Sequence, residues 1–213
     1  MSLYAVCKAL VSVYYRSLYR VRVEGHEHIP PEGGVIVCGN HFTANDPFMV
    51  AIAMKRPISY MAKQELFKNP LVGWLLRRIR VFPVKRGQPD RAAIKHSIEV
   101  LHSGTCFGIF PEGTRNRTGH LGKAEPGTAY LAIKSGAPVV PVGITSSYKL
   151  FGPILVRFGR PVDLSPYMSG KLTQEAIEGA SHTIMAAIGM QLDPPVNISV
   201  AAGKQADDSE QVK

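Results

Sequence analysis

The chain has 213 residues, of which 45% are hydrophobic, enough for a single domain with a substantial core. Its three cysteines are an odd number without CxxC or zinc-ligand spacing, and Cys38 and Cys106 lie in strand-like runs, which favours buried, reduced thiols and a reducing compartment. The formal net charge is +9, and residues 55–95 alone account for it, since eleven bases there face only Glu65 and Asp90. A basic segment of this kind attracts anionic lipid, nucleic acid or an acidic protein, and composition does not choose among them.

Residues 3–22 are predicted to form an amphipathic N-terminal helix. Apolar side chains recur at helical spacing beside a polar row: Leu3, Val6, Leu10, Val13, Tyr14, Leu18 and Val21 against Lys8, Ser12, Arg16 and Arg20. Two roles stay open, a helix that covers a core and a helix that lies in a membrane interface, where arginines meet lipid phosphates. The first apolar run is too short to cross a bilayer, and no signal-peptide cleavage pattern follows it.

Strands and helices alternate along the rest of the chain. Strands are predicted at 21–25, 35–38, 81–84, 106–110, 139–144 and 155–158, and helices at 47–55, 66–80, 89–103, over about ten residues ending at 134, and at 172–192. This alternation predicts an α/β fold in which a mostly parallel central sheet is flanked by helices. We therefore expect the amphipathic helix over 1–22, one domain over 23–196, and a polar, disordered tail over 197–213.

A short polar motif follows the apolar run 35–38. It begins with Asn40-His41 and ends at Asp46, which places it beyond the carboxyl end of a strand, where open α/β sheets bind ligands. If Asp46 accepts the Nδ1 hydrogen of His41, it fixes the tautomer and leaves Nε2 as a base near neutral pH. The alternative is structural, with Asp46 as the N-cap of the next helix and Pro47 at its first position.

A second polar motif, Pro-Glu-Gly-Thr-Arg at residues 111–115, follows another predicted strand. Gly113 permits close backbone approach, and the guanidinium of Arg115 matches a phosphate. Arg86, just beyond a third predicted strand, is a candidate for a second anion contact. For Glu112 and Arg115 the alternative is a charged turn, and for Arg86 it is solvated surface.

The usual protein nucleophiles are not found near His41. There is no G-x-S-x-G elbow and no cysteine beside it, so an attacking alcohol has to come from the substrate. No P-loop or dinucleotide fingerprint occurs. His26 and His28 have no further ligands near them and are interpreted as polar surface, so we expect neither a metal nor a cofactor.

Four motif blocks resemble those of the glycerolipid acyltransferases in order and approximate spacing: Asn40-His41 with Asp46, Phe82 to Arg86, Phe110 to Arg115, and Ala137 to Val142. The likeness covers roughly residues 20–190, and the chain looks like a small bacterial 1-acylglycerol-3-phosphate acyltransferase. The second block departs from the family pattern, which more often has Asp-Arg where this chain has Lys85-Arg86.

The resemblance implies a reaction and a set of site residues. His41, oriented by Asp46, would remove the proton from the hydroxyl of lysophosphatidic acid. The alkoxide would then attack an acyl thioester of coenzyme A or acyl carrier protein, which gives phosphatidic acid. The implied substrate-binding residues are Asn40, Arg86, Glu112, Gly113, Thr114 and Arg115. The resemblance also implies a peripheral enzyme on the cytoplasmic face of the cell membrane, with an anionic membrane surface as partner and no cofactor or metal.

Other interpretations stay open. The acceptor could instead be glycerol 3-phosphate, another lysophospholipid or a lyso-aminolipid, and a noncatalytic module could bind anionic lipid through residues 55–95. Nucleic acid is disfavoured, because Leu, Trp and Ile interrupt that basic segment in place of stacking aromatics or a known recognition motif.

Overall fold

The computed structural model describes residues 2–85, 90–116 and 120–196. The predicted disordered tail, 197–213, therefore lies outside the described residues, and so does Arg86.

The described strands form one mixed sheet of seven, in the order β1-β7-β6-β2-β5-β3-β4. They are β1 (Arg20–Glu24), β2 (Val35–Gly39), β3 (Ile58–Lys63), β4 (Val81–Val84), β5 (Cys106–Ile109), β6 (Val139–Ser146) and β7 (Pro153–Phe158). The strands from β6 to β4 run parallel, whereas β7 pairs antiparallel with β6 and parallel with β1 at the edge. The predicted α/β fold with a mostly parallel sheet is confirmed.

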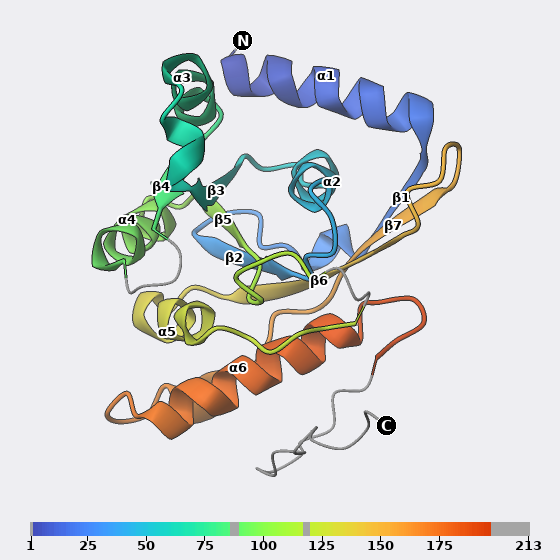
Figure 1. Cartoon of the computed structure of the whole chain (residues 1–213). Helices are drawn as coiled ribbons and strands as arrows, with labels where there is room; N and C mark the ends of the chain where they lie inside the picture. Colours follow the sequence, from blue (N-terminus) through green and yellow to red (C-terminus); the bar gives the residue numbers. More distant parts are fainter. Residues whose placement is uncertain (1, 86–89, 117–119, 197–213) are drawn as a thin grey trace, which may run out of the picture.

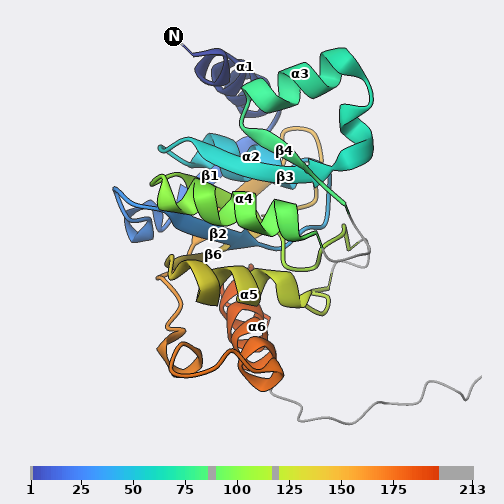
Figure 2. The same ribbon diagram turned by 90° about the vertical axis from the view of Figure 1, so that its left-hand side faces the viewer.

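Helices cover both faces of the sheet (Figure 1). One face is covered by α1 (Leu3–Leu18) and α2 (Asp46–Ala53), and the other by α4 (Arg91–His102), α5 (Pro126–Ser135) and α6 (Gln174–Gly189). The short helix α3 (Pro70–Arg78) lies beside α1 (Figure 2). Short 3-10 helices are η1 (His26–His28), η2 (Gln64–Phe67) and η3 (Ser165–Tyr167).

The central strand β2 shows why the chain needs two helical layers. Val35 and Val37 pack into the core under α1 and α2, while Ile36 and Cys38 pack into the core under α5 and α6. All four side chains are at most 1% exposed. Side chains alternate across a strand, so a strand that is apolar on both sides has to be covered on both faces.

Two predicted helices differ from the observed ones. The N-terminal helix ends at Leu18 rather than at residue 22, because the following residues pair with β7 as β1. The predicted helix 66–80 is η2 followed by α3, whose start is fixed by Asn69, which accepts the N–H groups of Leu71 and Val72. Strand β3 was not predicted, since its sequence combines Ser59, Tyr60 and Met61 without regular alternation.

The two polar motifs follow neighbouring strands, after which the chain continues to opposite faces of the sheet. β2 and β5 pair side by side, yet β2 leads into α2 on one face and β5 leads, through a loop, into α5 on the other. A crevice opens at such a point in an α/β sheet, outside the carboxyl ends of the strands. The fold therefore brings both motifs to one place.

Candidate active site

His41, in the loop after β2, and Asp46, the first residue of α2, lie together. Nδ1 of His41 is 3.2 Å from Oδ2 of Asp46, and the two side chains are only 11% and 2% exposed. Among the described residues, no group forms a hydrogen bond with Nε2 of His41. The pair thus has the geometry of an imidazole oriented by a carboxylate, with its second nitrogen available for a proton.

The Asp46 carboxylate closes this loop back on itself. Oδ2 also accepts the N–H groups of Phe42 at 2.7 Å and Thr43 at 2.6 Å, and Oδ1 accepts the Thr43 hydroxyl at 2.8 Å. All of these donors precede Asp46, which is itself the first residue of α2, and the N-cap Asn45 forms no side-chain capping bond. The alternative interpretation of Asp46 as the N-cap is therefore wrong.

Tyr148 supplies a further hydrogen bond to Asp46 from a distant part of the chain. It lies in the connection between β6 and β7, and its hydroxyl donates to Oδ1 of Asp46 at 2.9 Å. Burial, and then the negative charge of Asp46, raise the pKa of Tyr148 well above its ordinary value, so the hydroxyl keeps its proton. Sequence reasoning missed this residue, because the partners are 102 positions apart and no local pattern marks the contact.

Asn40 and Glu112 connect segments around the site, Asn40 to strand β6 and Glu112 to His41 and the loop before α5. The amide oxygen of Asn40 accepts the Ile144 N–H at 2.8 Å, and its amide nitrogen donates to the Ile144 carbonyl at 3.0 Å. Glu112 accepts the N–H of His41 through Oε1 and the N–H of Gly122 through Oε2, both at 3.0 Å. The structure shows both side chains hydrogen-bonded to backbone groups, and their contact with substrate stays a prediction.

An aromatic stack supports the imidazole. The ring of Phe110 is stacked on His41 with centroids 4.3 Å apart, and the ring of Tyr60 is stacked on Phe110 at 6.2 Å. Gly108 in β5 makes room for this arrangement, since a Cβ there would be 2.0 Å from the Tyr60 ring. The stack restricts rotation of the imidazole, as the hydrogen bond to Asp46 does from the other side.

The residue that follows the second motif, Asn116, contacts the backbone of His41. The N–H of Asn116 donates to the His41 carbonyl at 2.7 Å. The preceding residues, Gly113, Thr114 and Arg115, are exposed, and Gly113 has a φ of 66°, a conformation that glycine adopts without strain. Within residues 2–85, 90–116 and 120–196, no ion pair joins Arg115 to a carboxylate, so its guanidinium is available to an anion.

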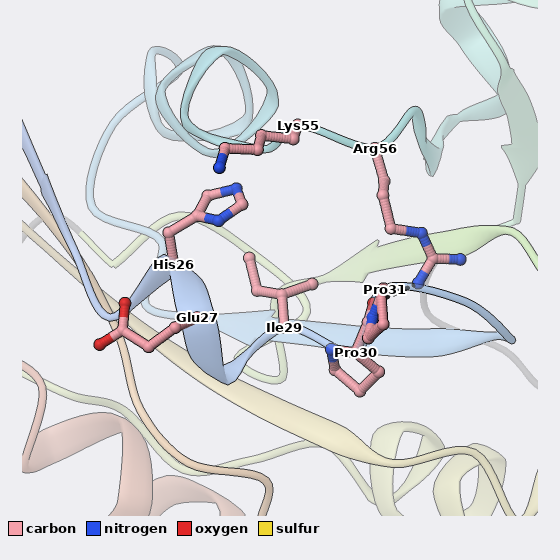
Figure 3. Close-up of a pocket in the computed structure, with 7 residues that line it drawn as sticks. All are labelled: His26, Glu27, Ile29, Pro30, Pro31, Lys55 and Arg56. Atoms are coloured by element: carbon pink, nitrogen blue, oxygen red, sulfur yellow. Dashed lines mark hydrogen bonds between the residues drawn. The ribbon is translucent and has the colours of Figure 1, made fainter.

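A cavity of about 460 Å³ (Figure 3) has neither His41 nor Asp46 in its lining. It is lined by His26, Glu27, Ile29, Pro30, Pro31, Lys55 and Arg56. These residues lead into β2 and β3, so the cavity lies near the amino ends of the strands, whereas the pair follows the carboxyl end of β2. No group of three metal-binding side chains occurs here or elsewhere in the described chain.

Arg56 holds the loops around this cavity together. Its guanidinium donates to the carbonyl oxygens of Pro30 and Gly104, each at 2.7 Å, and also to that of Gly33. Figure 3 shows the Lys55 ammonium beside the His26 ring. Burial, and then the charge of Lys55, lower the pKa of His26.

Helices α1 and α3 lie beside each other (Figure 2), and both carry exposed apolar side chains. We call these residues, which are 36–73% exposed, the α1–α3 surface: Leu3, Val6, Leu10, Val13, Tyr14, Leu71, Val72, Trp74 and Leu75. Arg77 and Arg78 lie at the end of α3, and the Arg78 guanidinium lies 5.6 Å from the Trp74 ring. On its inner side α1 buries Tyr15 in the core. None of the described helices combines the length and apolar character that a membrane span requires.

Comparison with known proteins gives concordant matches. The model of the Acyltransferase family matches residues 20–145, a range that contains His41, Asp46 and the second motif. A 1-acyl-sn-glycerol-3-phosphate acyltransferase from Bacillus subtilis is 32% identical over 166 residues, covering 75% of this chain and 82% of that protein. One from Borreliella burgdorferi is 34% identical over 134 residues, covering 62% and 54%, so the match spans about half the length of that relative.

A solved structure is similar over most of the chain. It is the 1-acyl-sn-glycerophosphate (LPA) acyltransferase, PlsC, from Thermotoga maritima, with a TM-score of 0.68 and 27% sequence identity. The similar region covers 86% of this chain and 76% of that one.

Proposed function

The chain belongs to the acyltransferase family, and from this premise we propose that it transfers a fatty acyl group to the free hydroxyl of lysophosphatidic acid. The product is phosphatidic acid, and the reaction is a step of phospholipid biosynthesis. The names of the similar proteins support this acceptor. The observation that carries the mechanism is the imidazole of His41, held through Nδ1 by Asp46, with Nε2 unbonded to any described group.

In the proposed reaction, Nε2 of His41 takes the hydroxyl proton while the oxygen attacks the carbonyl carbon of an acyl thioester. The new C–O bond forms, the C–S bond breaks, and the imidazolium returns its proton to the departing thiolate of coenzyme A or acyl carrier protein. Asp46 stabilises the imidazolium between these steps. The thioester is a co-substrate, and we propose that the reaction uses no cofactor and no metal.

The second motif provides the proposed seat for the glycerol phosphate. Arg115, with Gly113 and Thr114, would hold the phosphate, and Arg86 would be a second cation. This assignment is supported by the exposed guanidinium of Arg115, which forms no ion pair with any described carboxylate and lies one residue from the backbone contact with His41. Asn40 and Glu112 would keep base and seat in register through the hydrogen bonds described above.

We propose that the α1–α3 surface docks on the cytoplasmic face of the cell membrane. Exposed apolar side chains beside arginines suit an interface, and the basic segment 55–95 is attracted to anionic lipid. α1 also contacts the loop of the site, because the Tyr15 hydroxyl donates to Asn45 Oδ1 at 2.8 Å. A lysophospholipid in the membrane would therefore have its head group close to His41. The three free cysteines suit a reducing compartment.

A turnover assay tests this function. The purified chain is given lysophosphatidic acid with acyl-CoA or acyl-acyl carrier protein, and products are identified by mass spectrometry. We expect phosphatidic acid from the wild type and a kcat lowered by about 10²–10⁴-fold in His41→Ala. His102→Ala, which changes an exposed histidine at the end of α4, is the matched control. Equal turnover by wild type and His41→Ala would remove His41 from the mechanism.

The same assay separates the alternatives. A panel of glycerol 3-phosphate, other lysophospholipids and lyso-aminolipids identifies the acceptor by the highest kcat/KM. A noncatalytic lipid-binding module would bind anionic vesicles without acyl transfer to any acceptor in this panel. Vesicle binding that survives in His41→Ala, together with loss of turnover, supports the enzyme and separates docking from chemistry.

A further inference from the structure

We propose that Tyr148 is a positioning residue of the His41–Asp46 pair, which acts by fixing the Asp46 carboxylate and tying the loop of the site to the end of α1. The inference rests on the proposed function, because it concerns the same pair. It adds a residue that lies outside all four motif blocks and outside the matched range of the family model.

The first support is the set of donors around Asp46. Phe42, Thr43 and His41 all belong to the same loop, so their hydrogen bonds shape the loop without fixing it to the rest of the molecule. Tyr148 is the one donor to this carboxylate, within the described chain, that comes from another element. Loss of its hydroxyl would leave the loop internally bonded and the carboxylate less fixed relative to the sheet.

The second support is the backbone of Tyr148. Its φ is 49°, in the left-handed region, which a bulky side chain seldom adopts and which costs free energy. The N–H of Tyr148 donates to the Ser146 hydroxyl at 2.8 Å, which helps to hold this conformation. Strain that persists where it delivers a hydroxyl to a buried carboxylate is consistent with a role in the site.

The third support is the contact with α1. The Tyr148 ring meets Tyr19 edge-on at 5.9 Å, Tyr19 is stacked near Tyr15 at 6.0 Å, and Tyr15 donates to Asn45 beside Asp46. The N–H of Phe151 also donates to the carbonyl of the last residue of α1 at 2.7 Å. The connection that carries Tyr148 and the end of α1 therefore support the loop together.

The charge around the pair gives the expected sign of the effect. Tyr148 stays neutral because burial and Asp46 raise its pKa, so it withdraws negative charge from the carboxylate as a donor. Among the described residues, the other titratable groups near the pair are Tyr15, whose pKa burial raises, and Glu112, which accepts the His41 N–H. Removing only the Tyr148 hydroxyl leaves more charge on Asp46 and should raise the pKa of the imidazole.

The test is Tyr148→Phe, which keeps the ring and removes the hydroxyl. We expect kcat to fall about tenfold, a part of the ~10²–10⁴-fold that a positioned base supplies, with the KM values of both substrates unchanged. The acid limb of the kcat profile should move to higher pH by roughly half a unit. Tyr130→Phe in α5, which removes a hydroxyl outside these contacts, is the matched control.

Two further measurements separate positioning from general structure. In an Asp46→Asn background, Tyr148→Phe should cause no further loss of kcat, because its action passes through the carboxylate. A second tenfold loss there would overturn the inference. An NMR titration of His41, whose signal is assigned by its absence in His41→Ala, should give a higher imidazole pKa in Tyr148→Phe.

The outcomes distinguish this inference from the proposed function. An active wild type with unchanged kcat, pH profile and His41 titration in Tyr148→Phe would overturn the inference and leave the function intact. A wild type that forms no phosphatidic acid would overturn the function, and the His41 titration would then decide whether Tyr148 acts on the pair.

Discussion

We call the side of the sheet on which the parallel strands end the carboxyl edge, and the side on which they begin the amino edge. Each has a charged side chain held by several hydrogen bonds, a carboxylate at the carboxyl edge and a guanidinium at the amino edge. At the carboxyl edge Asp46 accepts hydrogen bonds from backbone, hydroxyl and imidazole donors. At the amino edge Arg56 donates to three carbonyl oxygens in two loops, the one between η1 and β2 and the one between α4 and β5. Asp46 shares its carboxylate with a ring that keeps a second reactive nitrogen, whereas the bonded partners of Arg56 are all carbonyls. Both charged groups are thus hydrogen-bonded. What distinguishes the candidate active site is the nitrogen beside Asp46, Nε2 of His41, which no described group bonds.

The cavity lies at the amino edge, with Arg56, and not at the carboxyl edge, with the candidate active site. Its 460 Å³ lie beside Arg56, while the His41–Asp46 pair follows the carboxyl end of β2, which pairs with β5. An acceptor that remains in a lipid surface needs an open approach rather than an enclosed cavity. The cavity and the candidate active site therefore lie in different parts of this molecule.

Asp46→Asn should have the largest effect at the carboxyl edge. An amide keeps the size but offers one acceptor oxygen, and its NH₂ group would face the N–H donors of Phe42 and Thr43 or the imidazole. We expect kcat to fall on the order of 10³-fold, measured with the turnover assay. Asp163→Asn, at an exposed position, is the control. Wild-type kcat in Asp46→Asn would show that the carboxylate only shapes the loop.

The candidate pair was predictable because its information is local. His41 and Asp46 are five positions apart and follow an apolar strand, so the sequence pattern alone located them at the carboxyl edge. The partners of Asn40 and Asp46 were not predictable, since Ile144 and Tyr148 are 104 and 102 positions away. Such contacts depend on the order of strands in the sheet, which periodicity does not contain.

The fold class was predictable for a similar reason, and its errors occur where local signals conflict. The N-terminal helix was extended too far because Val21 continues the helical spacing, although pairing with Ile154 places it in β1. Strand β3 was missed because Ser59 and Tyr60 interrupt its apolar pattern, although β4 and β5 flank it. In both cases hydrogen bonding to distant strands overrides the local preference.

Arg56→Met, at the amino edge, should lower stability and leave kcat unchanged, in contrast to Asp46→Asn. The variant removes the donors to Pro30, Gly33 and Gly104 but leaves His41 and its partners untouched. We expect the free energy of unfolding to fall by about 1–3 kcal/mol, since three carbonyls keep only water as a partner. Urea denaturation measures this loss, with the exposed Arg160→Met as control. A lower kcat at unchanged stability would mean that the amino edge takes part in the reaction.

Asp90 offers a more exposed counterpart of Asp46. Its carboxylate accepts the N–H of Lys85 at 2.9 Å, after β4, and the N–H of Ala93 at 3.0 Å, in the first turn of α4. These two hydrogen bonds lower the pKa of Asp90 from its usual 3.8. We expect Asp90→Ala to lose about 1 kcal/mol of unfolding free energy at neutral pH, with kcat per folded molecule unchanged.

The pH dependence of this loss has a definite sign. Because the pKa of Asp90 is lower in the folded chain than in the unfolded one, its stabilisation is fully present above about pH 3.8 and disappears as the pH falls through the folded-state pKa. Urea midpoints of wild type and Asp90→Ala should therefore differ at neutral pH and converge in acid. A difference that widens in acid would mean that the charge of Asp90 opposes folding, and backbone donors around a carboxylate would then not explain the stability of either acidic site.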